Sequence, residues 1–257
     1  MTCCCLKLVR KAFGERTVLA DLTLDLPAGG FTAIVGPSGA GKSTLLNLLG
    51  GLDTNFDGSL SWGDGANATR AAASRIGYCF QDPRLMPWMT LQRNLELVLP
   101  SSSRSRQRVR ELLRRVGLAG READFPGALS GGMQRRAALA RAMVVQPSLL
   151  LLDEPFASLD APTAADLRNL LLELWRGEGP AVVLVTHDLS EALQLADEVL
   201  FLCSDPGRIV HREPLGPSRL DPAVVREPQR LAADLLQRHP ELLSGIVAAQ
   251  NPYGRYT

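Results

Sequence analysis

Residues 36–44 read GPSGAGKST, and this segment constrains the fold more than any other part of the chain. It follows an apolar run, Phe31–Val35, that is typical of a strand, and it leads into a helical pattern that begins at Lys42. Its spacing is G-x-x-x-x-G-K-[ST], in which backbone N–H groups converge on phosphate oxygens and the next helix directs its positive end at the same anion. A tight turn needs no lysine, so the spacing predicts a loop that binds a nucleoside triphosphate.

The motif predicts the roles of individual residues in this loop. We expect Lys42 to reach the β- and γ-phosphates of ATP and the Ser43 hydroxyl to bind Mg²⁺. A glycine-rich connection with an incidental lysine is the alternative, but four fixed positions match by chance in roughly 1% of chains of this length. The residues expected to contact the nucleotide are Gly36, Pro37, Ser38, Gly39, Ala40, Gly41, Lys42, Ser43 and Thr44.

A second motif, LLLLDEP at residues 149–155, places two carboxylates at the end of an apolar strand. We expect Asp153 to hold Mg²⁺ through water and Glu154 to polarise the attacking water. Adjacent carboxylates at this place could instead cap the next helix, and the phosphate loop favours the catalytic interpretation.

Apolar runs separated by helical patterns predict an α/β protein with a largely parallel sheet. Strands are expected at residues 6–9, 31–35, 75–80, 149–153 and 181–186, and helices at 42–52, 104–116, 132–145, 162–176 and 189–196. Residues 85–147 contain helical patterns and no convincing strand. The expected organisation is a core formed by residues 1–84 and 148–215, an inserted helical subdomain at 85–147, and a tail at 216–257 with one amphipathic helix near 222–239.

The composition excludes several classes of protein. The formal net charge is +1, and the arginines of residues 104–115 alternate with leucines at helical spacing, so we expect a solvated helix face and no nucleic-acid partner. The five cysteines show no metal-binding spacing, which favours a reduced cytosolic setting. No run reaches the ~18 apolar residues of a membrane span.

The segment LSGGMQRR at residues 129–136, together with the motifs above, resembles the ATPase subunit of ATP-binding-cassette (ABC) transporters over residues 6–212. The resemblance implies a P-loop NTPase (RecA-like) core with an N-terminal antiparallel β-subdomain and an inserted helical subdomain. It implies further site residues: Phe13 to stack on adenine, Gln81 of the Q-loop as a catalytic and metal-binding residue, Ser130, Gly131 and Gly132 of the signature segment, Asp160 of the D-loop, and the switch histidine His187. Close relatives usually read L-S-G-G-M-R-Q-R, whereas here Gln134 and Arg135 stand in swapped order.

The resemblance also implies a mechanism with ATP and Mg²⁺ as cofactors. Two copies of the chain would pack head to tail, and each ATP would lie between the phosphate loop of one copy and the signature segment of the other. Hydrolysis would then let the dimer open.

The segment FQDPRLMPWMTLQRNL, which begins at Phe80, is similar to the corresponding segment of ATPases in the nitrate/sulfonate/taurine importer subgroup. This likeness implies a peripheral place on the cytoplasmic face of the membrane, permease partners that bind the Gln81–Met89 region, and an extracytoplasmic substrate-binding protein. Leu85, Met86, Trp88 and Met89 would line the permease groove, with packing in the helical subdomain as the alternative. Three other functions stay open: a thiamine-precursor importer, a lipoprotein-release or export ATPase, and a soluble cassette ATPase of DNA repair or cofactor assembly.

Overall fold

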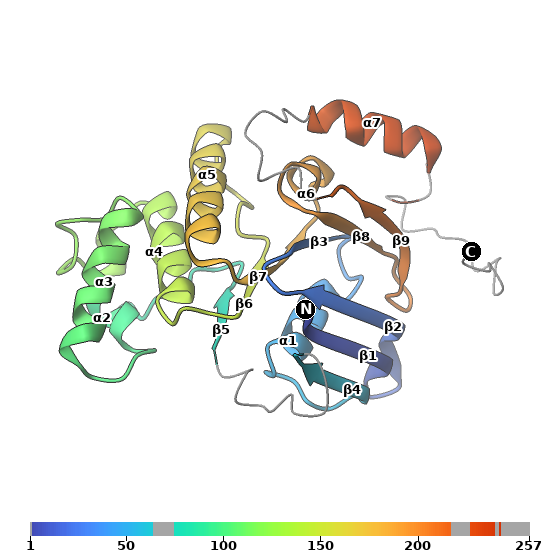
Figure 1. Cartoon of the computed structure of the whole chain (residues 1–257), viewed down its shortest axis with the longest axis horizontal. Helices are drawn as coiled ribbons and strands as arrows, with labels where there is room; N and C mark the ends of the chain where they lie inside the picture. Colours follow the sequence, from blue (N-terminus) through green and yellow to red (C-terminus); the bar gives the residue numbers. More distant parts are fainter. Residues whose placement is uncertain (1, 64–74, 217–226, 240–241, 243–257) are drawn as a thin grey trace. The chain divides into compact units, whose positions relative to one another are not determined.

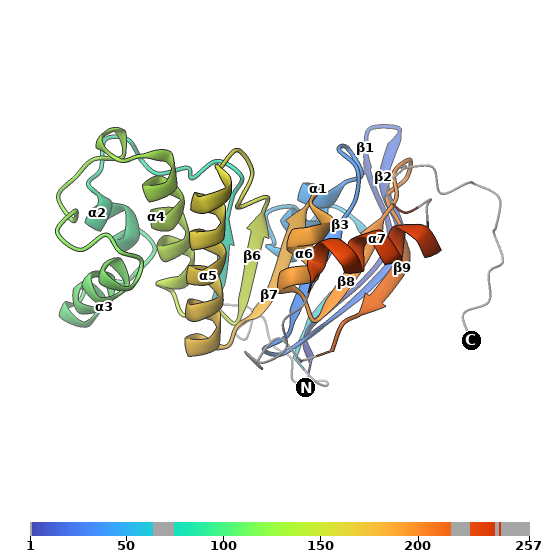
Figure 2. The same ribbon diagram turned by 90° about the horizontal axis from the view of Figure 1, so that it is seen from above.

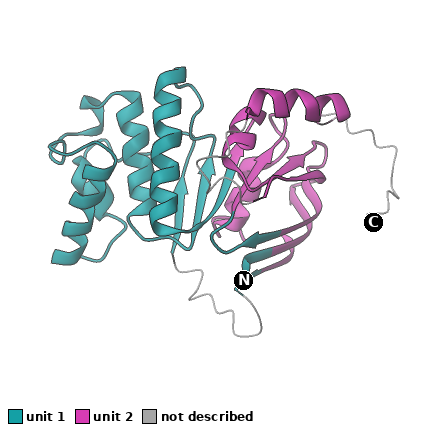
Figure 3. Cartoon of the chain, turned by 45° about the horizontal axis from the view of Figure 1, so that its top comes forward, with its two compact units in different colours: residues 1–5, 25–30, 61–184 teal, residues 6–24, 31–60, 185–257 magenta. Residues whose placement is uncertain are grey.

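The computed structural model describes residues 2–63, 75–216, 227–239 and 242. The chain divides into two units, which are coloured separately in Figure 3 and are treated one at a time below. The first unit comprises residues 1–5, 25–30 and 61–184, and the second comprises residues 6–24, 31–60 and 185–257.

Three strands of the first unit follow the order β5 (Ile76–Cys79), β6 (Leu149–Asp153) and β7 (Ala181–Thr186), with the last two residues of β7 assigned to the second unit. β5 and β6 are parallel, and Ile76 lies opposite Leu149. Every residue of β6 and β7 is buried. A strand that is covered on both faces needs an unbroken apolar sequence, which is why these runs could be recognised.

The first unit also contains the helices α2 (Leu91–Glu96), α3 (Ser103–Arg115), α4 (Gly131–Met143) and α5 (Ala161–Glu178), with a 3₁₀ turn at Pro126–Ala128. Helix α4 packs against β5 and α5, and Figures 1 and 2 both show α4 and α5 side by side. The interval 85–147 contains helices and no strand, as expected from the sequence.

In the second unit, β3 (Phe31–Val35) pairs in parallel with β8 (Glu198–Leu202), and β8 pairs antiparallel with β9 (Ile209–Pro214). Helix α1 (Lys42–Leu49) follows the phosphate loop, and α6 (Leu189–Leu195) packs against β3 and against α7 (Pro228–Arg238).

A three-stranded sheet in the order β2-β1-β4 confirms the N-terminal antiparallel β-sheet that the resemblance implied. Its strands are β1 (Thr2–Phe13), β2 (Arg16–Pro27) and β4 (Asp57–Trp62), and most of their residues belong to the second unit. Leu6 and Leu8 of β1 and Leu22 and Leu24 of β2 are buried at alternate positions, so one face of the sheet supplies the core.

All five strands predicted from the sequence are observed, three of them (β3, β6 and β7) with the predicted bounds, and several other boundaries were wrong. The expected helix at 42–52 ends at Leu49, where Gly50 is the C-cap. β2, β4, β8, β9 and α2 were missed. The tail helix is observed at Pro228–Arg238, and its expected start at residues 221–222 lies outside the described residues. No helix in the described part of the chain combines the length and apolarity that a membrane crossing requires.

Candidate nucleotide site

Two glycines of the phosphate loop are required by the backbone of the second unit. A Cβ on Gly36 would lie 2.4 Å from the Leu202 carbonyl oxygen of the neighbouring strand β8. Gly41 is the N-cap of α1 with φ at 92°, in the left-handed region that favours glycine, and a Cβ there would lie 2.7 Å from Leu19. The loop is therefore held tightly against its own unit, with the amino end of α1 next to it.

Lys42 lies within this loop. Its side chain is 6% exposed, and Nζ donates hydrogen bonds to the carbonyl oxygens of Gly36 at 2.8 Å and Pro37 at 2.9 Å. The ammonium group is thus held inside the loop whose backbone N–H groups the G-x-x-x-x-G-K-[ST] pattern assigns to phosphate binding. Ser43 and Thr44 follow in the first turn of α1.

Phe13 ends β1 and is 56% exposed. The ring is supported by Lys11, whose Nζ lies 4.5 Å from the ring centroid. Lys11 is only 2% exposed; it donates to the Asn55 carbonyl at 2.7 Å and forms an ion pair with Asp53 at 2.6 Å. The hydrogen bond from Lys11 lowers the pKa of the Asp53 carboxyl. The sequence analysis missed Lys11, because a charged residue in a strand gives no sign that it is buried.

His187 directly follows β7 and is exposed. Asp188, the next residue, is the N-cap of α6, and its carboxylate accepts from the N–H groups of Ser190 at 2.7 Å and Glu191 at 3.2 Å. The cap fixes where the chain turns after β7, and so fixes the backbone that carries His187.

Gly207 is a second residue that the sequence analysis did not assign to the site. A Cβ on Gly207 would lie 2.2 Å from the Ala40 carbonyl oxygen, and its N–H donates to the Val18 carbonyl at 2.8 Å. It supports the phosphate loop from outside at a place where only glycine fits. Its sequence signal is the tripeptide Asp205-Pro206-Gly207, a combination of residues that is typical of turns.

The carboxylates of the second motif lie at the carboxyl end of β6 in the first unit. Asp153 is 8% exposed and Glu154 is half-buried. Glu154 has a φ of 44°, which is uncommon for a residue other than glycine and costs on the order of 1–3 kcal/mol. Such conformations persist where the surrounding structure enforces them, often at functional sites.

The signature segment opens α4 in the same unit. Ser130 is the N-cap, and its hydroxyl accepts from the Met133 N–H at 3.3 Å. A Cβ on Gly131 would meet nothing within 4 Å, and one on Gly132 would meet only the Thr163 methyl group, at 2.8 Å. The first turn of this helix therefore has open space beside Gly131, and N–H groups at a helix amino end can donate hydrogen bonds to an anion.

Gln134 and Arg135, the two swapped residues, both bond to backbone carbonyl oxygens. Gln134 Nε2 donates to Pro126 at 3.1 Å and to Leu129 at 3.2 Å, which holds the loop before the signature segment. Arg135 Nη1 donates to Gln81 at 2.9 Å. Gln81 itself is exposed.

Asp160 is the N-cap of α5, a helix of the same unit. Its carboxylate accepts from the Thr163 N–H at 3.3 Å, and these hydrogen bonds from Thr163 lower its pKa. The sequence analysis assigned Asp160 to nucleotide binding and missed this cap.

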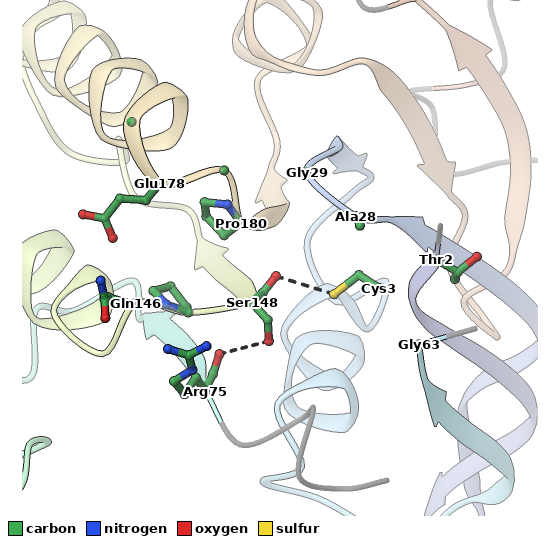
Figure 4. Close-up of a pocket in the computed structure, with 13 residues that line it drawn as sticks. Thr2, Cys3, Ala28, Gly29, Gly63, Arg75, Gln146, Ser148, Glu178 and Pro180 are labelled. Atoms are coloured by element: carbon green, nitrogen blue, oxygen red, sulfur yellow. Dashed lines mark hydrogen bonds between the residues drawn. The ribbon is translucent and has the colours of Figure 1, made fainter. Parts of the chain in front are cut away.

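A cavity of about 640 Å³ in the first unit lies away from these residues (Figure 4). Its wall includes Arg75, Ser148 and Pro180, which immediately precede β5, β6 and β7, whereas Asp153 lies at the opposite end of β6. Figure 4 shows Cys3 directed at Ser148, whose carbonyl accepts from the thiol at 3.5 Å. None of the predicted site residues lines this cavity.

The predicted site residues therefore form two groups. Phe13, residues 36–44 and His187 belong to the second unit. Gln81, residues 130–132, Asp153, Glu154 and Asp160 belong to the first unit. Within each unit they lie where strands end or helices begin, the places at which open α/β sheets bind ligands.

Comparison with known proteins identifies the family. The family model described as ABC transporter matches residues 19–157. An aliphatic sulfonates import ATP-binding protein of Burkholderia lata is 45% identical over 223 residues, which cover 85% of this chain and 81% of the relative. The chain belongs to the ABC transporter family. A protein of the same description from Streptomyces avermitilis is 49% identical over 199 residues, which cover 77% of this chain and 75% of the relative.

Solved ABC cassettes share the fold. The dimeric bacterial ABC transporter cassette MJ0796 matches with a TM-score of 0.70 at 34% identity, over 82% of this chain and 98% of that chain. The same cassette in a dimeric post-hydrolysis state, bound to ADP and Pi, matches with a TM-score of 0.69. The predicted P-loop ATPase fold is confirmed, and the chain is an ATP-hydrolysing transporter subunit.

Proposed function

We propose that the chain is the ATPase subunit of an importer for aliphatic sulfonates, and that two copies close on two ATP molecules to drive transport. The substrate class is supported by the names of relatives that are 45% and 49% identical. The dimer is supported by a likeness to a cassette that is dimeric and holds ADP and Pi. The single observation that carries the mechanism is the open helix end at Gly131, described above.

Residue roles follow from the chemistry of each side chain. Lys42 holds the β- and γ-phosphates, Phe13 stacks on adenine, and His187 lies beside the γ-phosphate. Glu154 polarises the attacking water. Its carboxylate is half-buried, and its backbone is held at a positive φ, so the side chain is suited to this role. Bound Mg²⁺ would neutralise phosphate charge, and the donors proposed for it, the oxygens of Ser43, Gln81 and Asp153, are of the hard type that this ion prefers.

The signature segment completes the site of the other copy. Its own unit does not require glycine at position 131, since a side chain there would meet no neighbour. Glycine is required if a phosphate of a partner-bound nucleotide comes close to the N–H groups of residues 130–132. Asp160, exposed beside this helix end at the start of α5, is proposed to lie at the same dimer interface.

The permease surface is proposed to centre on Trp88, which is 70% exposed. Of the four apolar residues singled out from the sequence, Leu85 is buried and Met86 and Met89 are half-buried, so packing accounts for part of the cluster. The loop is held by Asn94, which is fully buried. Its side chain accepts from the Met86 N–H at 2.7 Å and donates to the carbonyls of Met86 at 3.2 Å, Met89 at 3.1 Å and Thr90 at 3.1 Å.

These hydrogen bonds favour a docking site that is formed before the permease binds. The chain is proposed to bind the permease at the cytoplasmic face of the membrane, as a peripheral subunit. A large aromatic ring held out by a rigid loop loses little conformational entropy on binding, and such residues often dominate interfaces. A surface loop that is mobile would bind more weakly. The extracytoplasmic binding protein of the complex is proposed to select the cargo, which the ATPase does not contact.

Glu154→Gln tests the ATPase site. The variant keeps the size and hydrogen-bonding shape of the side chain, so it should bind Mg-ATP and form a stable dimer, while hydrolysis falls by about 10²–10⁴-fold. Light scattering with and without Mg-ATP measures the dimer. A variant that stays monomeric at saturating Mg-ATP, alone and with its permease, contradicts the dimer mechanism, and parental turnover removes Glu154 from its role.

Trp88→Glu tests the permease surface, with Phe125→Glu as the matched control because Phe125 is also an exposed aromatic of the helical interval, at 50%. We expect Trp88→Glu to retain basal ATPase activity and to lose co-purification with the permease. Unchanged co-purification would make the assignment of Trp88 wrong.

The substrate class is tested in the native host. A Glu154→Gln allele should abolish growth on an alkanesulfonate as the sole sulfur source and leave growth on sulfate intact. Loss of growth on nitrate or in the absence of thiamine, with growth on the sulfonate retained, would point instead to the other importer types.

A further inference from the structure

Arg135 joins three segments of the first unit through one side chain. It lies in α4, three residues after Gly132 of the signature segment. Its Nη1 donates to the carbonyl oxygen of Gln81 at 2.9 Å and to that of Pro155 at 3.2 Å. Gln81 is a proposed metal-binding residue, and Pro155 directly follows the proposed base Glu154.

These contacts form a short and stiff connection. Hydrogen bonds from a charged donor are stronger than those between neutral groups, and the planar guanidinium holds its acceptors in a fixed geometry. Arg135 is about 4.5 Å along the helix axis from Gly132, at a rise of 1.5 Å per residue. A shift of the amino end of α4 therefore moves the group that holds the Pro155 carbonyl, next to a Glu154 backbone with a φ of 44°.

We propose that Arg135 is a positioning residue that couples contacts at the signature segment to the placement of Gln81 and Glu154 in the same chain. This inference rests on the proposed function, in which the signature segment contacts the nucleotide held by the other copy. Occupation of one site then sets the catalytic groups of the second, so ATP hydrolysis is cooperative. The glutamine usual at this position in related sequences is shorter and uncharged, and cannot make two charge-assisted bonds.

Arg141 supplies a matched control on the same helix. Its Nη1 donates to the Arg84 carbonyl at 2.6 Å and its Nη2 to the Pro83 carbonyl at 2.8 Å. Like Arg135, it ties α4 to the segment that begins at Gln81, but its hydrogen bonds reach neither Gln81 nor Pro155. Loss of either arginine removes two backbone contacts, and only the loss of Arg135 releases the proposed catalytic groups.

The test compares Arg135→Gln, Arg135→Lys, Arg141→Gln and Glu154→Gln in the full chain, by ATP hydrolysis over a range of Mg-ATP concentrations and by thermal unfolding. We expect Arg135→Gln to lower kcat about tenfold, to change KM for ATP less than twofold, and to lower the Hill coefficient toward 1. Arg135→Lys should recover part of kcat, since an ammonium still donates to one or both carbonyls. Arg141→Gln should lower Tm as much as Arg135→Gln and keep the parental kcat and Hill coefficient.

Several results would overturn the inference. Parental kcat and cooperativity in Arg135→Gln, with Glu154→Gln inactive, would reject it and leave the proposed function intact. Equal losses of kcat in Arg135→Gln and Arg141→Gln would reduce Arg135 to a structural role, and a parental Hill coefficient of 1 would reject the coupling. If Arg135→Gln does not fold, parental kcat in a folded Arg135→Lys with a parental Hill coefficient supports only a structural role. Parental turnover in Glu154→Gln would instead reject the proposed function.

Discussion

The two glycine-rich segments of the chain look alike in sequence and differ in why they need glycine. In the phosphate loop, a side chain at Gly36 would collide with the Leu202 backbone, and Gly41 adopts a left-handed φ of 92°. In the signature segment, Gly131 has open space where a side chain would stand and needs no unusual φ. The glycines of the first segment are required by their own unit, whereas nothing in the described fold explains the glycine at position 131 of the second.

This difference separates folding from function at the level of single residues. A glycine that the fold requires says how a loop is built. Gly131, which the fold does not require, is proposed to mark a place where a partner-bound nucleotide approaches closely. The prediction is that substitutions in the two segments fail in opposite ways.

Gly36→Ala should have the largest effect. The Cβ would lie 2.4 Å from the Leu202 carbonyl oxygen, a backbone atom that cannot move without separating the loop from β8. We expect destabilisation of more than about 3 kcal/mol, at the upper end for overpacking, or a failure to fold. Chemical denaturation measures the loss. A variant with parental stability would show that the loop relaxes easily, and the contrast with Gly131 would disappear.

Gly131→Ala should keep the fold and lose activity. Alanine at an exposed helical position stabilises by up to about 1 kcal/mol, so Tm should stay the same or rise. Turnover should fall at least about tenfold, because the methyl group stands where a phosphate must approach the helix end. Gly127→Ala is the control: a Cβ there also meets nothing within 4 Å, and it lies outside the signature segment. Parental turnover in Gly131→Ala would contradict the interpretation of the open space.

Lys11→Met tests the support of the Phe13 ring, which is proposed to stack on adenine. The change leaves the Asp53 carboxylate and the Asn55 carbonyl without their donor, at a position that is 2% exposed. We expect destabilisation of about 2–3 kcal/mol and a higher KM for ATP, since the Phe13 ring loses the cation at 4.5 Å. Arg10→Met is the matched control. Arg10 lies next to Lys11 on β1, and its loss removes only an exposed hydrogen bond to Thr17 of β2. An unchanged KM for ATP would show that Lys11 does not contribute to nucleotide binding.

Much of the fold followed from the sequence, for identifiable physical reasons. Strands β3, β6 and β7 were placed correctly because burial on both faces demands unbroken apolar runs. The edge strand β9 was missed because its residues are half-buried or exposed and read as polar. Helix α2 has only six residues, too few for a periodic pattern.

The candidate site was predictable where a motif has fixed spacing, and not where support comes from distant backbone. Lys42, Ser130 and Asp188 could be assigned from neighbours in the sequence. Gly207 and Arg135 could not, because their partners, Ala40 for one and Gln81 and Pro155 for the other, are set by tertiary packing.

The pH dependence of Asp53 should give the smallest effect. Its hydrogen bond from Lys11 lowers the pKa of Asp53 in the folded chain, so its stabilising contribution is fully present above the unfolded pKa of about 3.9 and declines as the pH falls through the lower folded value. The difference in free energy of unfolding between the parental chain and Asp53→Asn should therefore be constant from about pH 5 to 7 and shrink below about pH 4. Urea denaturation at a series of pH values measures it. Because the carboxylate is partly exposed, added salt should reduce the difference at pH 7. A difference that persists undiminished at pH 3 would contradict this prediction, because it would show that the contribution of Asp53 to stability does not come from its ionised carboxylate.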